Sequence, residues 1–139
     1  MNLNSFELSI SSNGSISIPK FIGINEGDEL ILFQGKNGLV LLSLGELKLI
    51  SEKIQNDTSL GLNKRKRLIR NIFPFCISVS NFILNDNNIQ FILPKKVIDK
   101  YNLSDKLISE VYNNKVYLWE PTKYLEYQNS LCGSSKISR

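Results

Sequence analysis

Apolar and polar residues alternate with a period of two in the first and last parts of the chain, and follow a helical period in the middle. The alternation over residues 6–18 flanks Asn13-Gly14, a pair that readily takes the positive φ values of a tight turn. The pattern therefore predicts a β-hairpin over residues 6–18. Two more hairpins are predicted, at residues 30–42 around a GKNG turn and at residues 106–119 around Asn113-Asn114.

In the middle of the chain, hydrophobic residues recur at the spacing of amphipathic helices. The first stripe consists of Leu47, Ile50 and Ile54, and the second of Leu68, Ile69, Ile72 and Phe73. Pro74 cannot continue the second helix. Two helices are therefore expected between the strand-rich parts, joined by a linker in the sequence QNDTSLG, and a further helix is expected to begin at Pro121.

The two strand-rich parts repeat one another. The segments NGSISIPK (13–20) and NIQFILPK (88–95) each end a predicted strand in Pro-Lys, and Pro19 and Pro94 lie 75 positions apart. In the hairpins that follow, Leu39 and Val116 lie 77 positions apart, so both order and spacing agree. A chain of 139 residues is short for two full domains, and we therefore expect two half-domains that share one core.

The expected fold class is α+β, and the expected organisation has four parts. These are a first half-domain with its helix (1–54), a linker with a basic amphipathic helix (55–75), a second half-domain (76–127) and a polar tail (128–139). Hydrophobic residues make up 42% of the chain, which is typical of a packed globular protein. The first residues do not resemble a signal peptide, and no apolar run is long enough to span a bilayer. We expect a cytoplasmic protein that does not contact membranes.

The composition also restricts the chemistry. The chain contains no histidine, which removes the commonest general base and the commonest metal ligand. Its two cysteines, Cys76 and Cys132, lack the spacing of metal ligands and are expected to be reduced. We therefore expect a protein that is not an enzyme, with no catalytic residues, no cofactor and no metal site.

Positive charge is concentrated in the middle of the chain. Residues 61–101 hold eight lysines and arginines against two acidic residues, and the whole chain carries a formal net charge of +4. Five of these cations crowd the second predicted helix: Lys64, Arg65, Lys66, Arg67 and Arg70. Such a helix is typical either of a solvated basic face or of a contact with a polyanion such as nucleic acid. The sequence leaves both interpretations open.

The duplicated pattern resembles the MraZ family of bacterial transcriptional regulators, whose half-domain is shared with the AbrB-type swapped-hairpin DNA-binding proteins. The resemblance covers about residues 6–127 and includes the closing VYLWEPTKYLEY, which is similar to the family's strand ending in Trp and its following helix. It implies a pseudo-duplicated swapped-hairpin β-barrel core with amphipathic helices, and a ring-shaped homo-oligomer. It also implies a nucleoid-associated regulator that binds repeat-containing promoter DNA of the division and cell-wall gene cluster.

The family's motif in each half is Asp-x-x-Gly-Arg, and its arginine contacts DNA. Ser15 takes the arginine position in the first half (SSNGS, 11–15), and Gln90 takes it in the second half (DNNIQ, 86–90). Lysines follow the two strand-ending prolines instead: Lys20 follows Pro19, and Lys95 and Lys96 follow Pro94. Lys95 and Lys96 are equally suited to starting a helix without binding a partner. The DNA-binding residues that the resemblance implies are Ser15, Lys20, Gln90, Lys95 and Lys96. The alternative is a MraZ-like oligomeric scaffold or interaction protein that has lost sequence-specific DNA binding.

Overall fold

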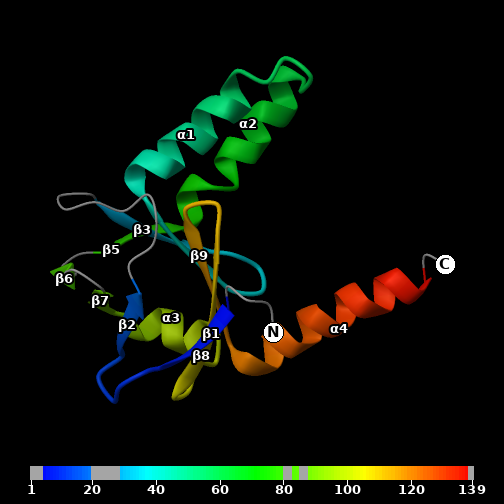
Figure 1. Ribbon diagram of the computed structural model, residues 1–139. Coiled ribbons are helices and arrows are strands. Elements are labelled where there is room, and N and C mark those ends of the chain that lie inside the picture. Colours follow the sequence, from blue (N-terminus) through cyan, green and yellow to red (C-terminus); the bar gives the residue numbers. More distant parts are fainter. Residues whose placement is uncertain (1–4, 20–28, 80–82, 85–87, 138–139) are drawn as a thin grey trace.

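The computed structural model describes residues 5–19, 29–79, 83–84 and 88–137 (Figure 1). Its strands are β1 (Ser5–Ser9), β2 (Ser15–Pro19), β3 (Leu30–Gln34), β4 (Leu39–Ser43), β5 (Cys76–Val79), β6 (Ile83–Leu84), β7 (Asn88–Ile92), β8 (Lys106–Tyr112) and β9 (Lys115–Trp119). Its helices are α1 (Leu44–Gln55), α2 (Leu62–Arg70), α3 (Lys95–Lys100) and α4 (Pro121–Ile137), with a 3-10 turn η1 (Phe73–Phe75). The predicted α+β class is confirmed.

The strands form two antiparallel sheets, in the orders β1-β8-β9-β4-β3-β5 and β2-β7-β6. The pairings among the described residues do not close either sheet into a barrel, in contrast to the barrel core that the resemblance implied. Two of the predicted hairpins are confirmed, as β3–β4 and β8–β9. Asn113 and Asn114 join β8 to β9 with φ values of 49° and 64°, the left-handed conformation that a two-residue hairpin turn requires.

The hairpin predicted over residues 6–18 is wrong. β1 pairs with β8 and β2 pairs with β7, so these two strands lie in different sheets. The turn itself does form, because Gly14 adopts a φ of 86° and its N–H donates to the Ser11 carbonyl oxygen at 2.9 Å. The alternation identifies which face of a strand is buried but not which strand lies beside it. Here pairing with the other half brings the apolar faces of β2 and β7 into one core.

The register of β2 and β7 has the symmetry that a duplicated chain predicts. Ile16 lies opposite Phe91, its equivalent in the repeat. On either side of this pair, Ser15 lies opposite Ile92 and Ser17 lies opposite Gln90. β4 and β9 pair in the same way about Val40 and Tyr117. Each strand-rich part therefore completes its sheets with strands of the other part.

The main core lies where the two sheets and α3 meet. It includes Ile18 from β2, Ile89 from β7 and Val97 from α3, each with an exposed fraction of 0%. The sequence pattern does not predict α3 as a helix of its own, although it marks Lys95 and Lys96 as suited to starting one. The six residues of α3 bring one fully buried side chain, Val97, into this core.

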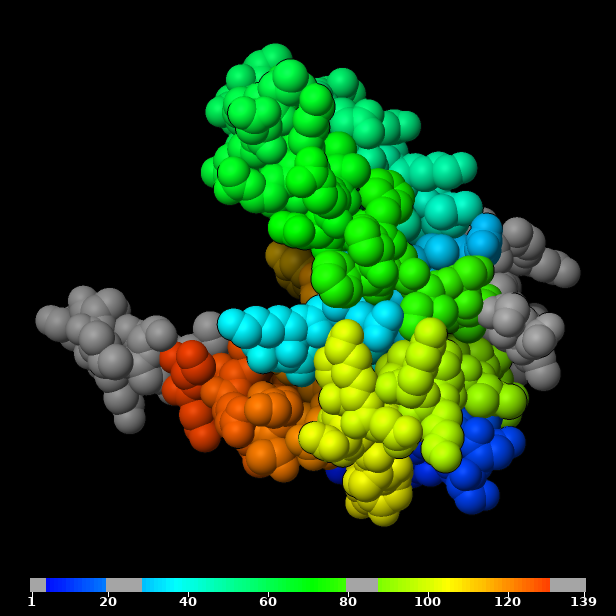
Figure 2. All heavy atoms as spheres, turned by 180° about the vertical axis from the view of Figure 1, so that it is seen from behind, coloured from blue at the N-terminus to red at the C-terminus, as the bar shows by residue number. Residues whose placement is uncertain are grey.

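The predicted helices of the middle segment form a pair that projects from one end of the sheets (Figure 1). The Ser43 hydroxyl caps α1 by accepting a hydrogen bond from the Glu46 N–H at 3.1 Å. Leu47 packs into a second, smaller core with Ile31 and Leu42 beneath this helix. Seen from behind, the pair stands as a lobe above the body of the molecule (Figure 2).

α4 begins at Pro121, as predicted, but continues to Ile137 through the stretch that was expected to be a polar tail. It extends away from the sheets on the side opposite β6 and β7 (Figure 1). Among the helices of the described residues, none combines the length and the apolar character needed to cross a membrane.

Candidate nucleic-acid interface

The outer face of β2 and β7 carries the two motif positions. Along these strands Ile16, Ile18, Ile89 and Phe91 point into the core, with exposed fractions of 2% or less. The alternating residues point outward, and neither strand contains a charged residue. The outward set is Ser15, Ser17, Pro19, Asn88, Gln90 and Ile92. This surface is called the ribbon face below.

Ser15 and Gln90 are neighbours on the ribbon face. The Gln90 amide nitrogen Nε2 donates to the Ser15 hydroxyl oxygen Oγ over 3.5 Å, a long hydrogen bond. Two side chains of the preceding turn hold the backbone of Ser15 in place. Its N–H donates to Ser11 Oγ at 3.0 Å and to Asn13 Oδ1 at 3.2 Å. The positions where the resemblance places two arginines, 75 residues apart in sequence, therefore meet at one point of the surface.

The lysines at the start of α3 lie close to the same turn. The Leu93 N–H donates to the Gly14 carbonyl oxygen at 2.9 Å, which joins the end of β7 to the Ser11–Ser15 turn. Pro94 precedes α3, and Lys95 and Lys96 follow it with exposed side chains. Lys20, the equivalent of Lys95 in the first half, lies outside the described residues.

This arrangement separates two kinds of contact that a DNA-binding surface needs. Ammonium groups at the edge, such as those of Lys95 and Lys96, suit phosphate oxygens, which fix position but carry no sequence information. Neutral hydroxyl and amide groups on the ribbon face suit hydrogen bonds to base edges. The sequence named all these residues, but only the register of β2 and β7 reveals that Ser15 and Gln90 share one spot.

The basic helix α2 lies apart from the ribbon face, in the projecting lobe (Figure 1). Lys64, Lys66, Arg67 and Arg70 are exposed on it. Arg65 is used internally, because its Nη1 donates to the Gln55 carbonyl oxygen at 2.7 Å. Hydrogen bonds from the Ser59 hydroxyl and N–H, and then the charge of Arg65, hold the pKa of Asp57 below its usual value. One of the five cations therefore braces the connection between α1 and α2.

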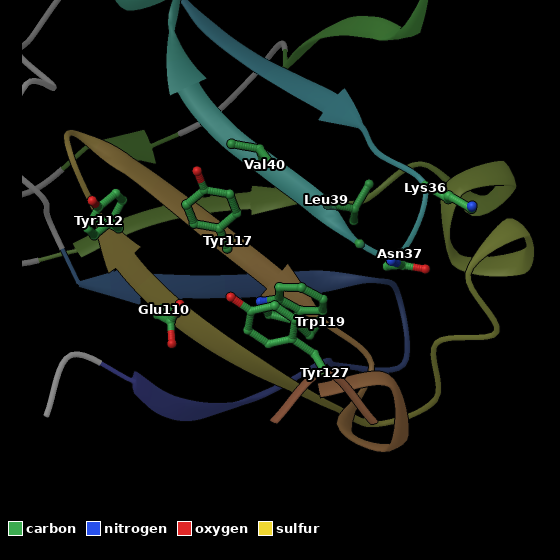
Figure 3. Close-up of a pocket in the computed structure, with 10 residues that line it drawn as sticks. Lys36, Asn37, Leu39, Val40, Glu110, Tyr112, Tyr117, Trp119 and Tyr127 are labelled. Carbon is green, nitrogen blue, oxygen red and sulfur yellow. The ribbon is translucent and has the colours of Figure 1, made fainter. Parts of the chain in front are cut away.

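A second feature, which the sequence pattern does not predict, is a hollow of about 550 Å³ lined by aromatic rings (Figure 3). Trp119 and Tyr127 stack against each other with ring centroids 4.8 Å apart, and they line the hollow together with Tyr117 and Tyr112. Burial, and then the neighbouring Tyr112, Glu110 and Tyr127, raise the pKa of Tyr117. A sequence signal for it does exist in Tyr112, Tyr117 and Trp119, the aromatic residues of the third predicted hairpin. Tyr127, however, comes from α4, and no local sequence pattern predicts that this helix packs beside the hairpin.

The described side chains offer no group of three or more acidic or cysteine residues that could hold a metal ion. The Cys76 thiol is half-buried, and burial raises its pKa, so it is a poor nucleophile.

The comparisons with known proteins agree with the resemblance seen in the sequence. No family model matches the chain. The transcriptional regulator MraZ of Clostridium acetobutylicum is 25% identical over 139 residues, which cover 99% of this chain and 94% of that relative. The similarity therefore runs from end to end, through both strand-rich parts and the helical middle. It supports the MraZ resemblance at the family level, and the relative is named as a transcriptional regulator.

Proposed function

We propose that this chain is a cytoplasmic, nucleoid-associated transcriptional regulator that binds promoter DNA through the ribbon face and the lysines beside it. The observation that carries the proposal is the contact between Gln90 and Ser15, which brings the two motif positions together on an exposed surface. The end-to-end similarity to a transcriptional regulator supports the same conclusion. The target that we propose is repeat-containing DNA upstream of division and cell-wall genes.

Phosphate binding is assigned to Lys95 and Lys96, with Lys20 as their equivalent in the first half. Because both motif positions are neutral, fewer counterions are released on binding than with arginine at these positions. We therefore expect a weaker affinity and a flatter salt dependence than in arginine-bearing relatives. Several copies in one assembly would offset this loss, since weak contacts add through effective concentration.

Assembly into a homo-oligomer, of the ring type, is part of the proposal. Leu62, Phe73 and Phe75 lie on or just after α2 with exposed fractions of 58%, 45% and 43%. Apolar side chains that are exposed to this degree suit a contact with another subunit. Light scattering at micromolar concentration tests this point, and a monomer mass would contradict it.

A second candidate is an oligomeric scaffold or interaction protein that has lost sequence-specific DNA binding. The observation in its favour is the absence of any charged residue from β2 and β7. A mobility-shift titration with division-gene promoter DNA, repeated over a series of salt concentrations, separates the two candidates. A regulator gives salt-dependent shifts that weaken in a Lys20→Ala, Lys95→Ala, Lys96→Ala triple variant, equally on all sequences. A scaffold gives no shift in either protein.

A further inference from the structure

We infer that the ribbon face reads A·T base pairs in the major groove, with Gln90 contacting adenine and Ile92 contacting the thymine methyl group. The inference rests on the proposed DNA-binding function and specifies its base preference. It starts from the side chains that the outer positions of β2 and β7 carry in this chain. Two of these side chains are large and exposed, and each has a distinct partner among the bases.

The backbone of the ribbon face suits the major groove, which admits a two-stranded antiparallel ribbon. β2 and β7 form such a ribbon over Ser15–Pro19 and Asn88–Ile92. Among the described residues, β6 pairs with β7 only through Ile83 and Leu84, opposite Gln90 and Ile89, and no described strand other than β2 lies beside Ile92. Ser15 and Ser17 have small side chains, which let the strands approach the base edges closely.

Gln90 has the hydrogen-bonding groups that adenine requires. In the major groove adenine presents the N7 acceptor and the N6 amino donor, which one glutamine amide satisfies together. One Nε2 hydrogen of Gln90 is directed to Ser15 Oγ at 3.5 Å. The other Nε2 hydrogen and the oxygen Oε1 then remain for N7 and the N6 amino group. Ser15 therefore acts as a positioning residue that holds the amide upright on the strand.

Ile92 supplies the complementary apolar contact. It is 58% exposed, and apart from Pro19 the other outward residues of this surface are polar. It lies two residues along β7 from Gln90, a separation of about 6.8 Å, or roughly two base-pair steps. The thymine C5-methyl group is the apolar feature of the major groove, and an isoleucine side chain can pack against it. Lys95 and Lys96 follow directly beyond this end of the ribbon, where phosphates would lie.

Modified bases test the inference, because they change the major groove and leave the minor groove intact. Fluorescence anisotropy would compare the full-length protein on A·T-rich and G·C-rich duplexes of equal length at fixed salt. We expect tighter binding to the A·T-rich duplex by about 5- to 150-fold, the range for one good bidentate base contact. Replacing adenine by 7-deazaadenine removes the N7 acceptor, and replacing thymine by uracil removes the methyl group. Each replacement should reduce the preference.

Two variants assign the two contacts. Gln90→Leu should lose its sensitivity to 7-deazaadenine and keep its sensitivity to uracil, while Ile92→Ala should show the reverse. Gln55→Leu is the matched control, because it makes the same chemical change at an exposed glutamine of α1, in the projecting lobe. It should behave as the parent protein does. Circular dichroism would verify that each variant is folded.

The outcomes distinguish this inference from the function on which it rests. If DNA is bound without an A·T preference, or with a preference that both modified bases leave unchanged, the inference is wrong and the proposed function stands. If no duplex is bound at low salt, the proposed function fails and the inference fails with it. If Gln90→Leu remains sensitive to 7-deazaadenine, another residue reads the adenine and the assignment to Gln90 is wrong.

Discussion

Gly14 holds the turn that connects the two halves at the ribbon face, and replacing it tests the structural basis of the site. Its φ of 86° is a backbone conformation that residues with a Cβ atom rarely adopt. A Cβ atom at this position would also lie 3.1 Å from the Leu93 carbonyl oxygen and 3.2 Å from Ile98 Cδ1. Gly14→Ala therefore combines backbone strain with a crowded contact to α3.

The expected loss of stability in Gly14→Ala follows from these two effects. A left-handed conformation costs an L-residue about 1 to 2 kcal/mol, and the crowded contact adds to it, because the carbonyl belongs to the backbone and cannot rotate away. We expect Gly14→Ala to lower the free energy of unfolding by about 2 to 3 kcal/mol. For a chain of this size, that corresponds to a drop in Tm of roughly 6 to 12 °C.

Urea denaturation followed by circular dichroism measures this change, and Gly45→Ala provides the matched control. Gly45 lies in the first turn of α1, where a Cβ atom would meet only Ser43 Oγ at an ordinary 3.8 Å. Alanine favours a helix over glycine by up to about 1 kcal/mol, so Gly45→Ala should leave stability unchanged or increase it. Equal unfolding midpoints for the two variants would refute the argument that this turn requires glycine.

Three further predictions concern other contacts. Tyr101→Phe removes the hydrogen bond to the Gly35 carbonyl oxygen, so it should cost about 1 kcal/mol at neutral pH in a urea titration. Because burial raises the pKa of Tyr101, the parent's stability should fall as pH rises above about 10, and the variant's should fall less steeply. Lys115→Met breaks the 3.7 Å ion pair with Glu46 that ties β9 to α1, with an expected loss of up to about 1 kcal/mol in thermal melts. Ser15→Arg combined with Gln90→Arg should tighten DNA binding and steepen the log-log salt slope by roughly 0.9 for each additional phosphate that the protein neutralises, as an anisotropy salt series would measure. A folded double variant with an unchanged slope would mean that these positions do not face DNA.

Local patterns predicted most of the elements, because each depends on a short run of residues. The hairpins of β3–β4 and β8–β9, the two helices of the middle segment and the start of α4 at Pro121 were all visible in the sequence. α3 was not predicted as a helix, because its six residues bury one side chain fully and leave too short a run for a periodic signal. The helical course of residues 128–137 was missed for a related reason, since these residues lack an apolar stripe.

The strand pairings between the two strand-rich parts could not be predicted from the sequence, for a different reason. Alternation identifies the buried face of a strand, but any other strand with a matching apolar face can lie beside it. Thus the alternation over residues 6–18 places Ile16 and Ile18 on one face, which is buried, while the pairing of β2 with β7 instead of β1 was not predicted. The candidate site depends on that pairing. The motif named Ser15 and Gln90 separately, and only the antiparallel register places them in contact.

The same register explains how a chain can keep this fold while it changes the residues of the site. Ile16 and Phe91, at the centre of the symmetric pairing, are 1% and 2% exposed, so replacing either by a polar residue would bury an unsatisfied group. Gln90, one position before Phe91, is exposed, and its side chain contributes little to the core. Substitution at the outer positions therefore leaves the packing intact while it alters what the surface can bind. Serine and glutamine at the two motif positions are thus compatible with an intact fold, and under the proposed function the ribbon face is the surface whose substitution changes the binding preference.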